Sequence, residues 1–131
     1  MIPDLSKGVA VDAAHSEKNR KTEIQGVDLE TGEIIFYKDI GNQTVNIGEF
    51  LAIVEGLKYI IRHNLPKILY SDSVTAIAWV KNKRTASAKK CKLMQMGEIY
   101  LKIAAHWTDR IQIVHWDSKL WGENPADFGN K

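Results

Sequence analysis

The chain has 131 residues, of which 44% are hydrophobic and 26% are charged, and its formal net charge is +2. This balance excludes a disordered chain, and no apolar run approaches the roughly 18 residues of a membrane span. We expect a single domain over residues 1–131 with no membrane segment. Residues 1–7 lack the apolar core of a signal peptide, and Cys91 is the only cysteine, which favours a reducing cytoplasm.

Three strands are predicted at the start of the chain. Residues 7–14 alternate small apolar side chains, and we expect this strand to end with Asp12 facing a cleft. Residues 22–29 and 33–40 are two further strand-like runs. Glu30, Thr31 and Gly32 join them, and glycine suits a left-handed turn residue, so the two runs predict a hairpin.

The rest of the chain alternates helices and strands. Apolar residues recur at helical spacing over residues 46–64, with Asn46 as the expected N-cap and Glu49 three residues later. Pro66 ends this helix, and residues 67–70 form a short strand that leads into Asp72. A second helix follows, with Ala76, Ile77, Trp79 and Val80 as its packed residues.

Three more elements complete the prediction. A third helix is marked by an apolar face, on which we expect Trp107 to be packed, and a strand follows over residues 110–116. Pro125 introduces a short terminal helix, expected from Glu123 to the end of the chain. The predicted face of the third helix consists of Leu93, Met96, Ile99, Tyr100, Ile103 and Trp107.

The element order βββαβααβα predicts an α/β fold with a five-stranded mixed sheet flanked by helices. Three antiparallel strands come first, and two strands reached by helical crossovers run parallel to the first strand. Ligands of such sheets gather at the carboxyl ends of the parallel strands. Asp12 and Asp72 are both expected at such ends.

Four carboxylates stand where a local reading would place an apolar or neutral residue: Asp12, Glu49, Asp72 and Asp127. Burying an acid is costly unless a cation or hydrogen bonds compensate. Oxygen ligands select Mg²⁺ or Mn²⁺, and the four histidines show no spacing typical of zinc ligands. Two such ions would activate water and stabilise the leaving oxygen of a phosphodiester. For each acid alone, an exposed strand-end or capping role is the alternative.

Six cations and no acid lie between Lys81 and Lys92. Such a segment suits the binding of phosphates, and a solvated charge run beside a helix is the alternative.

Four segments of the chain resemble the catalytic domain of ribonuclease HI, in the bacterial type with Glu in place of the active-site His. They are AVDAA, NIGEFLAIVEGL, YSDSVTAIAWVK and WGENPADFGNK, and each contains one of the four acids. The resemblance implies a ribonuclease H-like fold in which Asp12, Glu49, Asp72 and Asp127 bind two Mg²⁺ ions, with Mn²⁺ as a substitute. It also implies that Glu123 replaces a histidine that helps product release, and a capping acid is the alternative for Glu123.

The resemblance also implies contacts to nucleic acid. Thr44, Asn46 and Ser87 match positions of a phosphate pocket, and Asn46 also matches a minor-groove contact. Helix-entry or capping roles are the alternatives for these three residues. The remaining implied contacts are the main chain at Ser73 and the Ser118 hydroxyl, for which an ordinary loop serine is the alternative. The basic segment, with Lys89 and Lys90, would then hold the phosphates.

The chain departs from the family in the residues expected around the substrate. His15 and Lys18 lie in a first loop that lacks the usual glycine-rich turn. Val45 and Val74 stand where the family has amides that contact the minor groove, and Ala88 replaces a phosphate-binding threonine. These changes leave the expected metal site whole and reduce the polar contacts around it.

The sequence thus predicts a ribonuclease H, an endonuclease that cuts the RNA strand of RNA/DNA hybrids and leaves 5′-phosphate and 3′-hydroxyl ends. We expect a monomer with no obligate protein partner. The alternatives are a DNA nuclease of the same fold, such as a resolvase or transposase, and a non-catalytic module that binds hybrids.

Overall fold

A five-stranded mixed sheet with the order β3-β2-β1-β4-β5 forms the centre of the structure, a computed structural model that describes residues 5–87 and 91–128. Its strands are β1 (Val9–Ser16), β2 (Lys21–Asp28), β3 (Ile34–Asp39), β4 (Ile68–Ser71) and β5 (Gln112–His115). β1, β2 and β3 pair antiparallel, and β4 pairs parallel with both β1 and β5. The predicted α/β fold and mixed sheet are confirmed.

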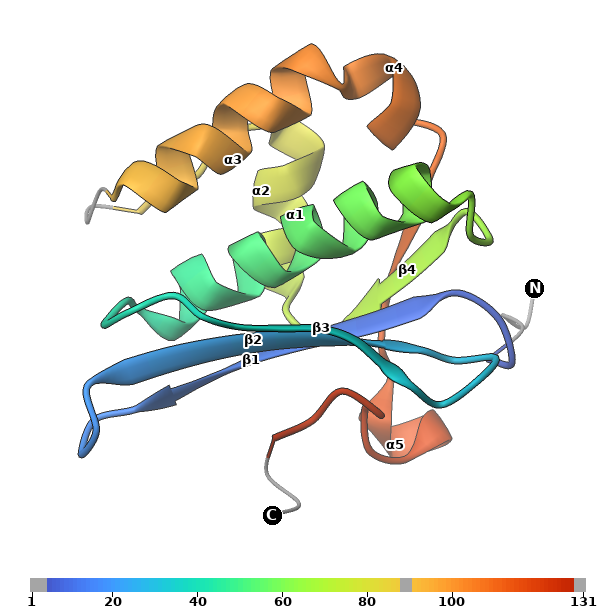
Figure 1. The fold of residues 1–131 in the computed structure, drawn as a ribbon, viewed down its shortest axis with the longest axis horizontal. Helices are drawn as coiled ribbons and strands as arrows, with labels where there is room; N and C mark the ends of the chain where they lie inside the picture. The colour runs from blue at the N-terminus through green and yellow to red at the C-terminus, as the bar shows by residue number, and fades with distance from the viewer. Residues whose placement is uncertain (1–4, 88–90, 129–131) are drawn as a thin grey trace.

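The helices of the described residues are α1 (Val45–His63), α2 (Val74–Asn82), α3 (Lys92–Ile103), α4 (Ala105–Thr108) and α5 (Ser118–Trp121). Figure 1 shows α1 to α4 on one face of the sheet, and α5 with the C-terminal segment on the other. None of the helices in the described ranges is long and apolar enough to cross a bilayer.

α1 lies close against the sheet because its packed face includes glycine. A Cβ atom at Gly56 would stand 2.6 Å from Leu69 Cδ1 and 2.9 Å from Val11 Cγ1, and one at Gly48 would stand 2.9 Å from Thr22 Cγ2. The larger side chains of α1 then fill the core between the sheet and the other helices. This close approach fixes how far a side chain of α1 reaches over the strands.

A second, smaller cluster covers the opposite face of the sheet. Ala10, Tyr70 and Trp116 are buried there, and Trp121 packs against them. The rings of Tyr70 and Trp116 meet edge to face with their centroids 5.6 Å apart, a favoured aromatic geometry. The indole N–H of Trp116 donates to Gly122 O, which ties the chain after α5 to this cluster.

The first strand differs from its predicted bounds. β1 continues to Ser16, because it pairs with β2 as far as Ser16↔Lys21, whereas its parallel pairing with β4 ends at Ala10↔Tyr70. The prediction that the strand ends near Asp12 is therefore wrong for the edge of β1 that pairs with β2. The hairpin of β2 and β3 has Gly32 at φ +75°, as its turn requires.

The caps and the third helix also differ from the predictions. Thr44, not Asn46, caps α1, since its hydroxyl accepts a hydrogen bond from Ile47 N. The third helix ends at Ile103, and Ala104 separates it from the short α4, so the observed order is βββαβαααβα. Trp107 is 55% exposed, which makes its predicted packing wrong.

The predicted packed face of the third helix is wrong for most of its residues. α3 buries Met94, Gly97 and Leu101 instead, because a Cβ at Gly97 would stand 2.9 Å from Phe50 Cε2 and this close approach turns that side of α3 towards α1. The predicted residues that are exposed on α3 are Leu93, Met96, Ile99 and Ile103.

No helix starts at Glu123 within the described residues, contrary to the prediction. The helical turn lies earlier, at α5, where the Asp117 side chain accepts hydrogen bonds from Lys119 N and Leu120 N. After α5, the side chain of Asn124 accepts a hydrogen bond from Ala126 N, and side-chain bonds of this local kind compete with helix formation.

Candidate metal centre

Three of the four predicted carboxylates converge in the structure. One oxygen atom from each of Asp12, Glu49 and Asp72 lies within 4.8 Å of the other two. Asp12 and Glu49 are each 7% exposed, and Asp72 is exposed. The three side chains come from β1, from α1 and from the loop after β4, so the fold brings together distant parts of the chain.

The strand pairing makes room for this convergence. Asp12 lies two residues beyond Ala10, where the pairing of β1 with β4 ends. Side chains alternate along a strand, so Asp12 shares the face of Ala10, opposite to α1. Since no β4 backbone stands beside Asp12, Glu49 can reach it from the second turn of α1.

Asp72 is held by the serines on either side of it. The backbone N–H of Ser73 donates to Ser71 Oγ over 3.1 Å, and Ser73 Oγ in turn accepts a hydrogen bond from Ala76 N as the N-cap of α2. The chain therefore turns sharply at the carboxyl end of β4, and Asp72 is presented at this turn. The predicted position of Asp72 at a strand end is confirmed by this arrangement.

Burial and mutual repulsion change the acidity of two of these groups. Desolvation, followed by the nearby charge of Asp72, raises the pKa of Asp12 to about 7. Desolvation, followed by the charge of Asp12, raises the pKa of Glu49 to about 10. Such shifts mean that the charged forms lack a compensating cation among the groups of residues 5–87 and 91–128.

The donor set fits a hard divalent cation. Glu49 Oε1 is buried and has no hydrogen-bond partner among the described residues, a costly state for a carboxylate oxygen that a cation would relieve. Mg²⁺ and related ions bind through one or more carboxylates and keep water in their other positions, for which the exposed Asp72 leaves access. The cluster is therefore compatible with divalent metal.

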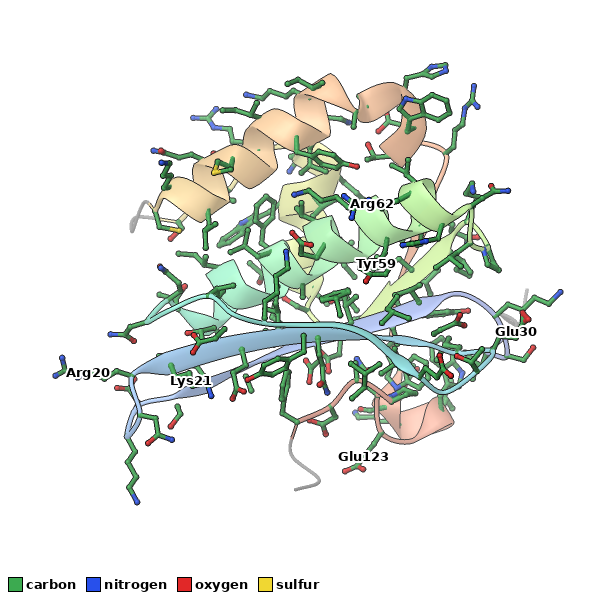
Figure 2. All side chains as sticks on the ribbon, in the orientation of Figure 1. Arg20, Lys21, Glu30, Tyr59, Arg62 and Glu123 are labelled. Carbon is green, nitrogen blue, oxygen red and sulfur yellow. The ribbon has the colours of Figure 1, made fainter. Side chains whose placement is uncertain are left out.

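Asp127 lies beside this group without joining the set of three. Asp127 is half-buried, and its charge is the smallest of the causes that raise the pKa of Asp12. Glu123 is exposed, and Figure 2 shows its side chain pointing away from the sheet. The structure thus brings Asp127 towards the cluster and leaves Glu123 at the surface.

The residues expected to contact nucleic acid lie at helix starts and in loops. Thr44 and Asn46 are exposed at the start of α1, Ser73 caps α2, and Ser118 is exposed at the start of α5. Ser87 is half-buried and does not cap α3, which Cys91 caps. Ala88, Lys89 and Lys90 lie outside the described residues.

Thr44 and Val45 border a hollow of about 420 Å³ that the sequence did not indicate. His15 and Gln43 also line this hollow, and both bond to Thr22. Thr22 Oγ1 donates a hydrogen bond to Gln43 O over 2.8 Å and accepts one from Gln43 N over 3.0 Å. Because the Thr22 proton is used, His15 Nδ1, 2.9 Å away, is the donor to Thr22 Oγ1. The polar Thr22 within a buried strand was the one available sequence signal.

No family model matches the chain. Among solved structures, it is similar to LC11-RNase H1, isolated from compost by a metagenomic approach, with 16% identity over 86% of this chain and 84% of the other and a TM-score of 0.59. The same enzyme in complex with an RNA/DNA hybrid gives a TM-score of 0.58 at 16% identity, with 86% of each chain covered. RNase H1 from Halobacterium salinarum NRC-1 is 15% identical over 87% of both chains, with a TM-score of 0.53. The chain therefore has the ribonuclease H fold.

Proposed function

We propose that this protein is a ribonuclease H that hydrolyses the RNA strand of RNA/DNA hybrids with divalent metal. The observation that carries the proposal is the cluster of Asp12, Glu49 and Asp72 at the end of the β1–β4 pairing. The ribonuclease H fold, and the hybrid complex of a protein with this fold, support the choice of substrate. Mg²⁺, two ions in each site, and 5′-phosphate and 3′-hydroxyl products are part of the proposal.

In this proposal the four acids hold the ions. The buried Asp12 and Glu49 and the exposed Asp72 would be the ligands, and Asp127 would add a fourth carboxylate. When bound, the ions supply an activated water and stabilise the leaving oxygen of the phosphodiester. The protein residues need only bind and orient, which agrees with the absence of a His or Cys nucleophile from the described cluster.

Residues around the acids would orient the hybrid. Thr44 and Asn46 at the exposed start of α1 would bind a phosphate of the DNA strand, aided by the helix dipole. Ser73, Ser87 and Ser118 would add contacts, with Lys89 and Lys90 near the backbone. Glu123, exposed at the surface, would assist product release by moving towards the site.

The buried state of the acids argues against a module that only binds hybrids. A binder of polyanions gains nothing from unfilled carboxylates, and Asp12 and Glu49 both have a raised pKa, an electrostatic cost that a metal would relieve. A DNA nuclease of the same fold would differ from a ribonuclease H in its substrate and not in its metal centre. A comparison of cleavage on hybrid, RNA and DNA substrates therefore distinguishes the two enzymes.

The test compares labelled RNA/DNA hybrid, double-stranded RNA and double-stranded DNA with Mg²⁺ or Mn²⁺. We expect metal-dependent cleavage of the hybrid alone, with Asp72→Asn and Asp12→Asn each slower by at least about a hundredfold, equivalent to about 3 kcal/mol of transition-state stabilisation. Glu30→Gln is the matched control, because it neutralises an exposed acid in the turn between β2 and β3. Absence of metal-dependent cleavage on all three substrates contradicts the proposal.

A further inference from the structure

Asn124 joins the C-terminal segment to the central strand. Its side chain is buried, and its Nδ2 donates to Val11 O over 3.0 Å, across 113 positions of sequence. Its Oδ1 accepts a hydrogen bond from Ala126 N over 2.9 Å. The two backbone groups that it bonds belong to the residues immediately before Asp12 and Asp127. The side chain of Asn124 thus links the backbone next to Asp12 to the backbone next to Asp127, and both acids are proposed metal ligands.

Val11 is free to accept this bond because of the sheet register. The pairing of β1 with β4 ends at Ala10↔Tyr70, one residue earlier. Leu29 N donates to Gly8 O, and in an antiparallel pair every second residue makes such bonds, so the even-numbered residues of β1 bond to β2. The odd-numbered residues point their backbone groups the other way, and the carbonyl of Val11 therefore faces the β4 side. Asn124 therefore takes the place that a strand partner would otherwise fill.

Gln25 holds the same segment from β2. It is buried directly opposite Asp12 in the register of β1 and β2, and its Nε2 donates to Ala126 O over 2.6 Å. Ala126 is thus bonded at its N–H by Asn124 and at its C=O by Gln25. Pro125, with its fixed φ, precedes it and reduces the freedom of the unbonded segment.

We propose that Asn124 and Gln25 are positioning residues that hold Asp127 beside Asp12 and so complete the metal centre. This inference rests on the proposed function. Asp127 carries charge of the same sign as the acids that it joins, and this charge helps to raise the pKa of Asp12, so repulsion opposes its placement. Two neutral amides oppose that repulsion without adding a cation that would compete for the site.

The test uses Asn124→Leu and Gln25→Met, which preserve side-chain size and remove the amide donors. Two measurements are made on the protein without substrate: hydrogen exchange over residues 122–128, and Mn²⁺ binding by calorimetry. We expect faster exchange in this segment and Mn²⁺ affinity lower by about tenfold in each variant, as for other groups that orient metal ligands. The double variant should lose little more than either single variant, since both amides hold the same residue, Ala126.

Thr85→Val is the matched control. Thr85 is as buried as the two amides, and its hydroxyl donates to Glu98 over 3.1 Å, between the end of α2 and α3. We expect this variant to keep the Mn²⁺ affinity and the exchange of residues 122–128, so a general loss of stability is separated from loss of positioning.

The outcomes distinguish the two proposals. Unchanged exchange and unchanged Mn²⁺ affinity in Asn124→Leu and Gln25→Met overturn the positioning role. If the unmodified protein does not bind Mn²⁺, the proposed metal centre is wrong, and Asp127 cannot complete it. Faster exchange in the variants would in that case still show that Asn124 and Gln25 hold the segment of Asp127 against the sheet.

Discussion

The two buried acids make the metal-free protein sensitive to pH. An exposed Asp or Glu ionises near pH 4, whereas the pKa of Asp12 is raised to about 7 and that of Glu49 to about 10. Above about pH 4 the folded state therefore keeps protons that the unfolded chain has released. Stability consequently falls as the pH rises, through about pH 7 for Asp12 and on towards pH 10 for Glu49.

We expect the free energy of unfolding in EDTA to fall between pH 5 and pH 9, relative to that of Glu49→Gln. The slope is up to about 1.4 kcal/mol per pH unit for each acid that is charged only in the unfolded chain. Denaturant titration of both proteins at several pH values measures it. A free energy of unfolding that stays constant or rises with pH, relative to that of Glu49→Gln, would mean that Glu49 ionises normally in the folded state.

Two single residues make the exposed starts of α1 and α2 apolar. Val45 is 47% exposed and Val74 is 66% exposed, each directly after the N-cap of its helix. Val74 lies two residues after Asp72 and Val45 lies four residues before Glu49, and both present apolar surface where the resemblance leads us to expect amides. The departure predicted from the sequence therefore concerns two exposed positions, and under the proposed function they would face the hybrid.

At the scale of elements, the start of α1 combines two roles in Thr44. Thr44 caps the helix, and it is also the proposed phosphate contact. Thr44→Asp should leave stability unchanged, because Asp is as good an N-cap and its charge suits the helix dipole. The same charge repels phosphate, so we expect the KM for hybrid to rise by about tenfold at low salt.

Thr44→Ala is the comparison, because it removes the cap and adds no charge. It should cost about 1 kcal/mol of stability in thermal or denaturant unfolding. If Thr44→Asp leaves the KM unchanged as well as the stability, Thr44 serves only as a cap.

Elements whose signal is local were predictable, and contacts across the chain were not. The hairpin, α1 and the strand before Asp72 follow from periodicity, Gly32 and Pro66, and the convergence of Asp12, Glu49 and Asp72 follows from their places on those elements. α3 carries apolar residues on two sides, so its sequence could not say which side meets α1. The side facing α1 depends on Gly97 against Phe50, a tertiary contact.

The C-terminal segment was mispredicted for a similar reason. Its conformation depends on Val11 and Gln25, which lie about a hundred positions away in the sequence, as the bonds from Asn124 and to Ala126 show. Asn124 and Pro125 look like an ordinary turn when read alone. Asp127 could therefore be singled out from the sequence as a candidate ligand, whereas the residues that hold its segment could not.

At the scale of the whole molecule, metal binding should stabilise the entire fold. The proposed ligands come from four distant parts of the chain, so the unfolded chain has no comparable site. A bound ion present at a hundred times its Kd adds about 2.7 kcal/mol. We expect Mn²⁺ to raise the Tm of the protein and of Glu30→Gln, but not that of Asp12→Asn. Equal shifts in all three proteins would place the ion elsewhere.

The order β3-β2-β1-β4-β5 has a consequence for the time course of folding. β1, β2 and β3 are joined by short turns, and contacts between near neighbours in sequence form fast. β4 must then close a loop of more than fifty residues to reach β1, and the segment holding Asp127 closes a longer one. The candidate metal centre is therefore expected to assemble only after β1, β2 and β3 have paired.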